Sequence, residues 1–215
     1  RNELTVTGAS GSPGAGIGSV ATQGKMIATK QGLALDSRNQ RVYIADGTRN
    51  LRGIDGTSAA NAANADRDVN IDLESVQIGN VLGVFQDATM TYVYGVDANG
   101  TDLHAIRFAT VLVANGAQIP NANVTINTVN IGAQITDGSI MNFTGNTLTD
   151  VGGKTVLYVS TGNTIKAYTL DRGGDPGTLS VSPHADLSFT GLINTVEDFT
   201  FVQSSDTEVM VYITE

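Results

Sequence analysis

Three basic residues recur at one place in a repeating pattern and are the first candidates for chemistry. Arg52, His104 and Lys166 each follow a tyrosine by eight to ten residues, in an apolar stretch of successive repeats. Equivalent residues of a repeat array take equivalent positions on it. The spacing therefore predicts part of a basic ring that binds acidic groups, on a chain whose net charge is −9. The alternative is that these side chains only reach solvent at a sheet edge.

Aspartates at the ends of apolar stretches form the second set of candidates. Asp46 and Asp97 close two tyrosine-containing segments, and loops on a rigid scaffold commonly carry binding residues. Asp97, Asn99 and Asp102 also offer oxygen ligands close together, as a calcium ion requires. The same residue types favour tight turns, because an aspartate side chain accepts hydrogen bonds from nearby backbone N–H groups. We expect no cofactor, with calcium at these three residues as the alternative.

Catalytic motifs are incomplete in this chain. Gly14–Ser19 lacks the last glycine of a dinucleotide-binding fingerprint, and the two histidines, His104 and His184, lie in no recognisable triad pattern. The absence of cysteine excludes disulfides, thiol catalysis and cysteine-ligated zinc. The acidic balance, 21 Asp and Glu against 12 Lys and Arg, disfavours nucleic acid and anionic membranes as partners. These features favour a protein that is not an enzyme.

The elements that must position these residues repeat along the chain. Each repeat holds a segment made of an aliphatic residue, a tyrosine, two mostly small or aliphatic residues and a polar residue. The four segments are 42–46, 93–97, 157–161 and 211–215. Their period of roughly fifty to sixty residues is typical of a unit of four strands. The 25 glycines and the low charged fraction of 15% likewise favour strands and turns.

Further apolar stretches flank each tyrosine segment and predict the other strands of the unit. A strand that precedes the tyrosine is expected at 32–36, 82–85, 140–143 and 199–202. A third strand is expected at 51–54, 103–106 and 165–168, and a fourth at 69–73, 124–127 and 186–189. Turn residues separate the strands, and alternation of apolar and polar residues predicts one buried face. The pattern therefore predicts four-stranded antiparallel units.

Two stretches resemble a known family more closely than the rest of the chain. Gly32–Asp46 resembles a blade of the NHL and YVTN-type β-propellers, and Leu157–Asp171 resembles blades of the lactonase-like propellers. The resemblance implies an all-β, β-propeller-like array of four-stranded antiparallel blades. It specifies a blade rather than an activity.

The repeats predict a single domain over residues 1–215, with three full repeats and a partial fourth. Residues 1–24 are a glycine-rich N-terminal segment, in which 3–7 and 19–22 are strand-like and are candidates to complete the last blade. The alternative is that the chain is part of a longer propeller. No apolar signal core or long apolar run is present, and we expect a secreted, periplasmic or cell-surface protein without membrane insertion.

The expected function is a non-catalytic β-propeller scaffold that presents a loop face to a protein, peptide or glycan. Two alternatives stay open. One is a hydrolase or lactonase-like enzyme with its site in a central channel, and the other is a structural or cell-surface subunit.

Overall fold

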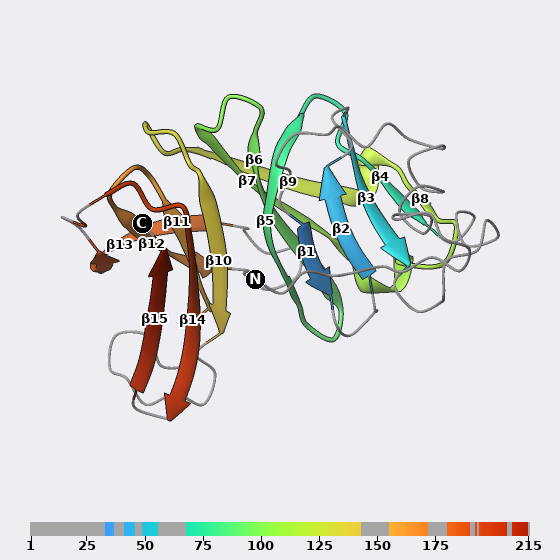
Figure 1. Cartoon of the computed structure of the whole chain (residues 1–215). Coiled ribbons are helices and arrows are strands. Elements are labelled where there is room, and N and C mark those ends of the chain that lie inside the picture. Colours follow the sequence, from blue (N-terminus) through green and yellow to red (C-terminus); the bar gives the residue numbers. More distant parts are fainter. Residues whose placement is uncertain are drawn as a thin grey trace, which may run out of the picture.

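The chain is a row of β-sheets, as the computed structural model in Figure 1 shows. The structure describes residues 33–36, 41–45, 49–55, 68–142, 155–171, 180–189, 192, 194–205 and 208–214. In these ranges the regular structure is strand, apart from two short 3-10 turns at Thr110–Leu112 and Asn121–Asn123. No helix in the described part is long and apolar enough to cross a membrane.

Three sheets and one hairpin follow one another along the sequence. The first sheet holds β1 (Leu33–Asp36), β2 (Arg41–Ala45), β3 (Asn50–Asp55) and β4 (Val69–Asp72) in that order. The second holds β5 (Ile78–Gln86), β6 (Met90–Asp97), β7 (Asp102–Ala109) and β9 (Val124–Asn130). The third holds β10 (Asp137–Asn142), β11 (Thr155–Ser160), β12 (Ile165–Asp171) and β13 (Ser180–Phe189). The hairpin is β14 (Asp198–Ser205) with β15 (Glu208–Thr214).

Within the described residues, the strands predicted around the tyrosine segments are present and follow one another in the predicted order. Tyr43, Tyr94, Tyr158 and Tyr212 all lie on the second strand of their unit, and the neighbouring strands are antiparallel. Registers agree as well, because the first three tyrosines lie opposite Gly53, Ala105 and Ala167 of the third strands. Tyrosines at the sequence period therefore lie on corresponding strands of the described antiparallel sheets.

The first sheet differs from the prediction in having a fifth strand. β8 (Gln118–Ile119) leaves the second sheet after β7 and pairs in parallel with β4, so that Gln118 lies opposite Asn70. A two-residue strand is too short to give a sequence period. Its position comes from tertiary contacts: Asn70 N–H donates to the Ala117 carbonyl at 2.9 Å. The guanidinium of Arg41 donates to Asn115 Oδ1 at 2.6 Å.

The sheets pack face to face by one rule. We call the side of a unit that carries its repeat tyrosine the tyrosine face. The opposite side, which carries the residues just before and after that tyrosine, is the aliphatic face. Tyr43 and Leu51 pack with Val93 and Ile106 of the next sheet. The tyrosine face of each unit thus covers the aliphatic face of the next.

The other two interfaces repeat this contact. Tyr94 packs in one core with Leu157 and Val159 of the third sheet. Tyr158 packs with the hairpin, where its ring stacks on Phe201 with centroids 4.0 Å apart. Alternating strands place one apolar set on each side of a sheet, so both faces of the second and third sheets are buried.

The first strands of the units lie side by side, β1 against β5, β5 against β10 and β10 against β14. The approach of β5 to β10 is close enough that a Cβ at either of two glycines would force a neighbouring side chain to shift. A Cβ at Gly138 would lie 2.9 Å from Leu82 Cβ, and one at Gly83 would lie 2.6 Å from Ile140 Cδ1. In the described residues the row of sheets does not close into a ring. The predicted closing strands at 3–7 and 19–22 lie outside the described residues.

We predict that Gly138→Ala destabilises the protein by about 1–3 kcal/mol, because the new methyl overlaps Leu82 Cβ at the contact between β5 and β10. Urea unfolding of the single variant measures this loss. Leu82→Ala alone should cost about 2–5 kcal/mol. If the overlap is the cause, adding Gly138→Ala to Leu82→Ala should cost less than it costs in the wild type. Equal costs in both backgrounds would show that the overlap does not matter.

Candidate functional site

The structure places the three predicted basic residues at equivalent positions. Arg52 lies opposite Ile44, His104 opposite Gly95 and Lys166 opposite Val159, in each case opposite the residue that follows the repeat tyrosine. All three therefore belong to the aliphatic face of their sheets. The equivalence of position holds, while a common role in binding stays a prediction.

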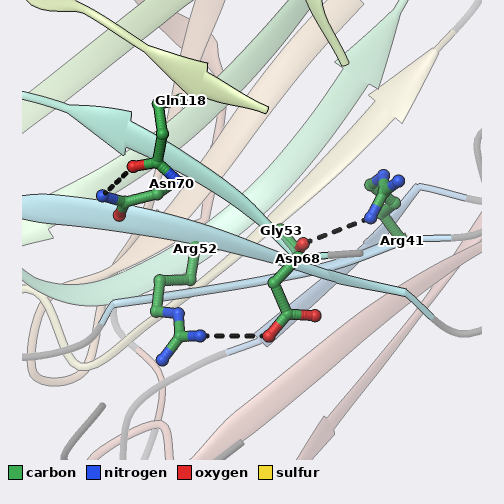
Figure 2. Close-up of polar contacts among 6 residues, drawn as sticks. All are labelled: Arg41, Arg52, Gly53, Asp68, Asn70 and Gln118. Carbon is green, nitrogen blue, oxygen red and sulfur yellow. Dashed lines mark hydrogen bonds and ion pairs between the residues drawn. The ribbon is translucent and has the colours of Figure 1, made fainter. Parts of the chain in front are cut away.

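Arg52 is held by a buried ion pair. Its Nη2 lies 3.0 Å from Oδ2 of Asp68, which directly precedes β4, and both side chains are about nine-tenths buried (Figure 2). A buried charge without a partner costs several kcal/mol, so each group offsets the cost of burying the other. The guanidinium is thereby compensated inside the first sheet.

His104 is buried and uncharged near neutral pH. Its Nδ1 lies 2.9 Å from Thr128 Oγ1 on β9. Burial lowers the pKa of His104, although the carboxylates of Asp97 and Asp102 raise it in part. Lys166 is half-buried. The three positions thus differ in charge state and exposure, although their register is the same.

Asp97 forms the turn between β6 and β7. Its carboxylate accepts hydrogen bonds from the backbone N–H groups of Asn99, Thr101 and Asp102 at 2.9–3.2 Å. Burial raises its pKa, but these bonds and His104 outweigh burial, and the net pKa is lowered. Gly100 takes the positive φ of 78° that the turn requires. The turn role predicted for Asp97 is confirmed, and Asp46 lies outside the described residues.

Calcium near Asp97, Asn99 and Asp102 stays a prediction. One carboxylate oxygen of Asp102 accepts a hydrogen bond from Asn130 Nδ2. Within the described ranges no group of three or more His, Cys, Asp or Glu side chains is arranged to hold a metal ion.

A polar pocket at the edge of the first sheet was not predicted from the sequence. It has a volume of about 360 Å³ and is lined by Asn50, Asn70, Asp72, Gln118, Ile119 and Pro120. Asn70 Nδ2 donates to Gln118 Oε1 at 3.0 Å, which joins β4 to β8 (Figure 2). Asp72 and Gln118 are exposed, and Asn50 and Asn70 are half-buried. The pocket therefore offers amide and carboxylate groups to a ligand.

Sequence reasoning missed this pocket because β8 supplies part of its wall. The segment arrives from between β7 and β9 of the second sheet and carries no repeat signal. A usable signal was the set of polar residues on alternate positions of β3 and β4, Asn50, Asn70 and Asp72. In a sheet with its other face in the core, such alternation marks the open face.

A second missed feature is a pair of carboxyl groups between the third sheet and the hairpin. Asp137 begins β10 and Asp198 begins β14, and the two side chains share a hydrogen bond. Burial, together with the neighbouring Asp198, raises the pKa of Asp137 to about 6. Both residues stand opposite the second residue after a repeat tyrosine, Ser160 and Thr214, a register that only the paired strands reveal.

Comparison with known proteins gave no match, either to a family model or to a curated protein.

We predict that Asp137→Asn stabilises the protein at pH 8. The folded-state pKa of about 6 exceeds the ordinary value of 3.8, so the wild type loses stability as pH rises from about 4 to 6. The amide of the variant does not ionise, so the stability of the variant should change less with pH between about 4 and 6. After allowance for solvent screening, the gain at pH 8 should be about 1 kcal/mol.

Thermal unfolding between pH 3.5 and 8 measures the difference. Asp87→Asn is the matched control, because hydrogen bonds from Thr89 and Met90 outweigh the effect of burial and lower the pKa of Asp87. That variant should give no gain at pH 8. An Asp137→Asn protein no more stable than the wild type at pH 8 would contradict the assignment.

Proposed function

We propose that this protein is a non-catalytic binding scaffold of β-propeller type whose binding surface is the polar pocket on the first sheet. Support for the propeller type comes from the repeat of four-stranded antiparallel units, which pack face to face with their first strands side by side. This is how blades pack in a propeller. The resemblance of Gly32–Asp46 and Leu157–Asp171 to propeller blades points the same way.

The ligand we propose is an extended peptide segment of a partner protein. β8 is the last strand of the first sheet in the described part, so its outer edge offers backbone groups to an added strand. Beside it, the side chains of Asn70, Asp72 and Gln118 match the donors and acceptors of a peptide backbone. The observation that carries the proposal is this meeting of an open strand edge with an amide-lined pocket.

The lining residues themselves favour peptide over glycan. No aromatic side chain lines the pocket to stack on the face of a sugar ring. They also favour binding over catalysis, because amides and one carboxylate hold a ligand by hydrogen bonds and supply no paired nucleophile and base. The Arg52–Asp68 pair adjoins the site, since Arg52 lies opposite Asn70 on the same face of the sheet.

We predict that random-peptide phage selection on the wild type enriches a common peptide, and that Asn70→Ala with Gln118→Ala weakens its binding about tenfold or more. Loss of about 1.4 kcal/mol of hydrogen bonding gives that factor. Fluorescence anisotropy with the synthetic peptide measures the affinity. Because Gln118 is exposed and Asn70 is half-buried outside the apolar core, the double variant should keep its melting temperature within a few degrees.

Asn123→Ala is the control, because Asn123 is an exposed amide in the same connection that does not line the pocket. It should bind the peptide like the wild type. A selected peptide that binds the double variant unchanged would rule out the pocket as its site. Binding to a glycan array instead, lost in the double variant, would replace the peptide with a glycan.

A further inference from the structure

In the described part, β15 is the tyrosine strand that has a partner strand on one side only. The tyrosine strands β2, β6 and β11 each pair with a strand on both sides, whereas β15 pairs with β14 alone. Figure 1 shows β15 on the side of β14 that faces away from β10, at the end of the row. The outer edge of β15 therefore offers backbone N–H and C=O groups to a further strand.

The exposure of the side chains on β15 agrees with an open edge. Tyr212 is 55% exposed and Met210 is 41% exposed, whereas the tyrosines of the other three units are 0–3% exposed. Glu208 and Thr214, at the ends of the strand, are exposed as well, and no described residue of β15 is buried. An apolar strand with an open edge is a template for pairing with another chain.

We propose that β15 pairs with β15 of a second copy of this chain, antiparallel and related by a two-fold axis at Val211. The contact makes one sheet in the order β14, β15, β15 of the second copy and β14 of the second copy. This sheet has four strands, as the second and third sheets have. Because the same edge meets itself, the contact needs only one kind of open surface and is complete with two chains.

The register around Val211 places compatible side chains opposite each other. It sets Met210 opposite Tyr212 of the second copy, and a methionine sulfur packs well against an aromatic ring. It also sets Glu208 opposite Thr214 of the second copy, so the two Glu208 carboxylates lie about 20 Å apart at about 3.4 Å per residue. That separation exceeds the Debye length of about 8 Å at physiological salt, so these charges do not oppose the contact.

A second copy fits this edge better than β8 does, because all seven residues of β15 find partners in the symmetric register, whereas β8 has two residues. Short strand pairs are small interfaces, so the dimer should form and dissociate with concentration. Self-pairing goes beyond the peptide-binding role and does not depend on it.

The first experiment is sedimentation velocity on the full chain over a range of concentrations. The wild type should pass from the 22.3 kDa monomer to a dimer as concentration rises, and should grow no further. A monomer at every concentration would overturn the proposal, and is the result expected if another segment of the same chain covers the edge. Growth beyond the dimer would also overturn it, because a two-fold contact is complete with two chains.

Paired charges test the register. Met210→Glu with Tyr212→Glu places like charges directly opposite each other and should weaken the dimer about tenfold or more. Met210→Lys with Tyr212→Glu changes the same two positions but sets opposite charges against each other, and should regain most of that loss. Val111→Glu is the control, since Val111 is 86% exposed in the 3-10 turn after β7, and it should dimerise like the wild type. Equal weakening by both double variants would contradict the register.

Cross-linking keeps the test valid if a charged variant fails to fold. The chain has no cysteine, so introduced cysteines report this contact alone. Opposed residues of an antiparallel pair have Cα atoms about 4.5–5.5 Å apart, within reach of a disulfide, while diagonal neighbours are about 7–8 Å apart. A mixture of Met210→Cys and Tyr212→Cys chains should therefore form a heterodimeric disulfide under mild oxidation, in much higher yield than Tyr212→Cys chains form a homodimeric one. Equal yields would overturn the antiparallel pairing at Val211.

Discussion

The packing of a tyrosine face on the aliphatic face of the next sheet is the contact on which the rest of the structure depends. It occurs three times in the described part, and the large buried side chains of each core come from two units at once. A four-stranded sheet alone has no second layer to cover its apolar side. Burial raises the pKa of Tyr158 to about 12, so its phenol stays neutral and this packing does not change with pH in the ordinary range.

That packing also limits which residues fit where the units meet. The first strands approach so closely that a Cβ at position 83 or 138 would force the side chain of Ile140 or Leu82 to shift. The packing of β10 beside β14 also buries Asp137 near Asp198, and burial first, with the neighbouring carboxyl second, raises the pKa of Asp137. One geometric constraint thus explains two features that look unrelated in the sequence.

The buried polar groups add specificity to a row held together mainly by apolar contacts. A one-residue slip of β3 would carry Arg52 from the aliphatic face to the apolar core side, away from Asp68. His104 is fixed to Thr128 in the second sheet in the same way. Forming each pair costs desolvation free energy, and losing the partner in a wrong register makes that register less stable. We regard register control as the structural role of these residues, whichever ligand the protein binds.

The sequence by itself determined the strands, their order and the equivalence of Arg52, His104 and Lys166. These features follow from the local alternation of apolar and polar residues and from the recurrence of a tyrosine at a regular spacing. Both can be read directly from the order of residues in the chain. Tertiary structure alone decided that Arg52 meets Asp68, that Asp137 meets Asp198, and that β8 joins the first sheet. Such contacts join residues far apart in the chain, and their energies depend on burial and exact approach. The polar pocket depends on β8, whose two residues are too few to show a period, so only the folded chain could reveal it.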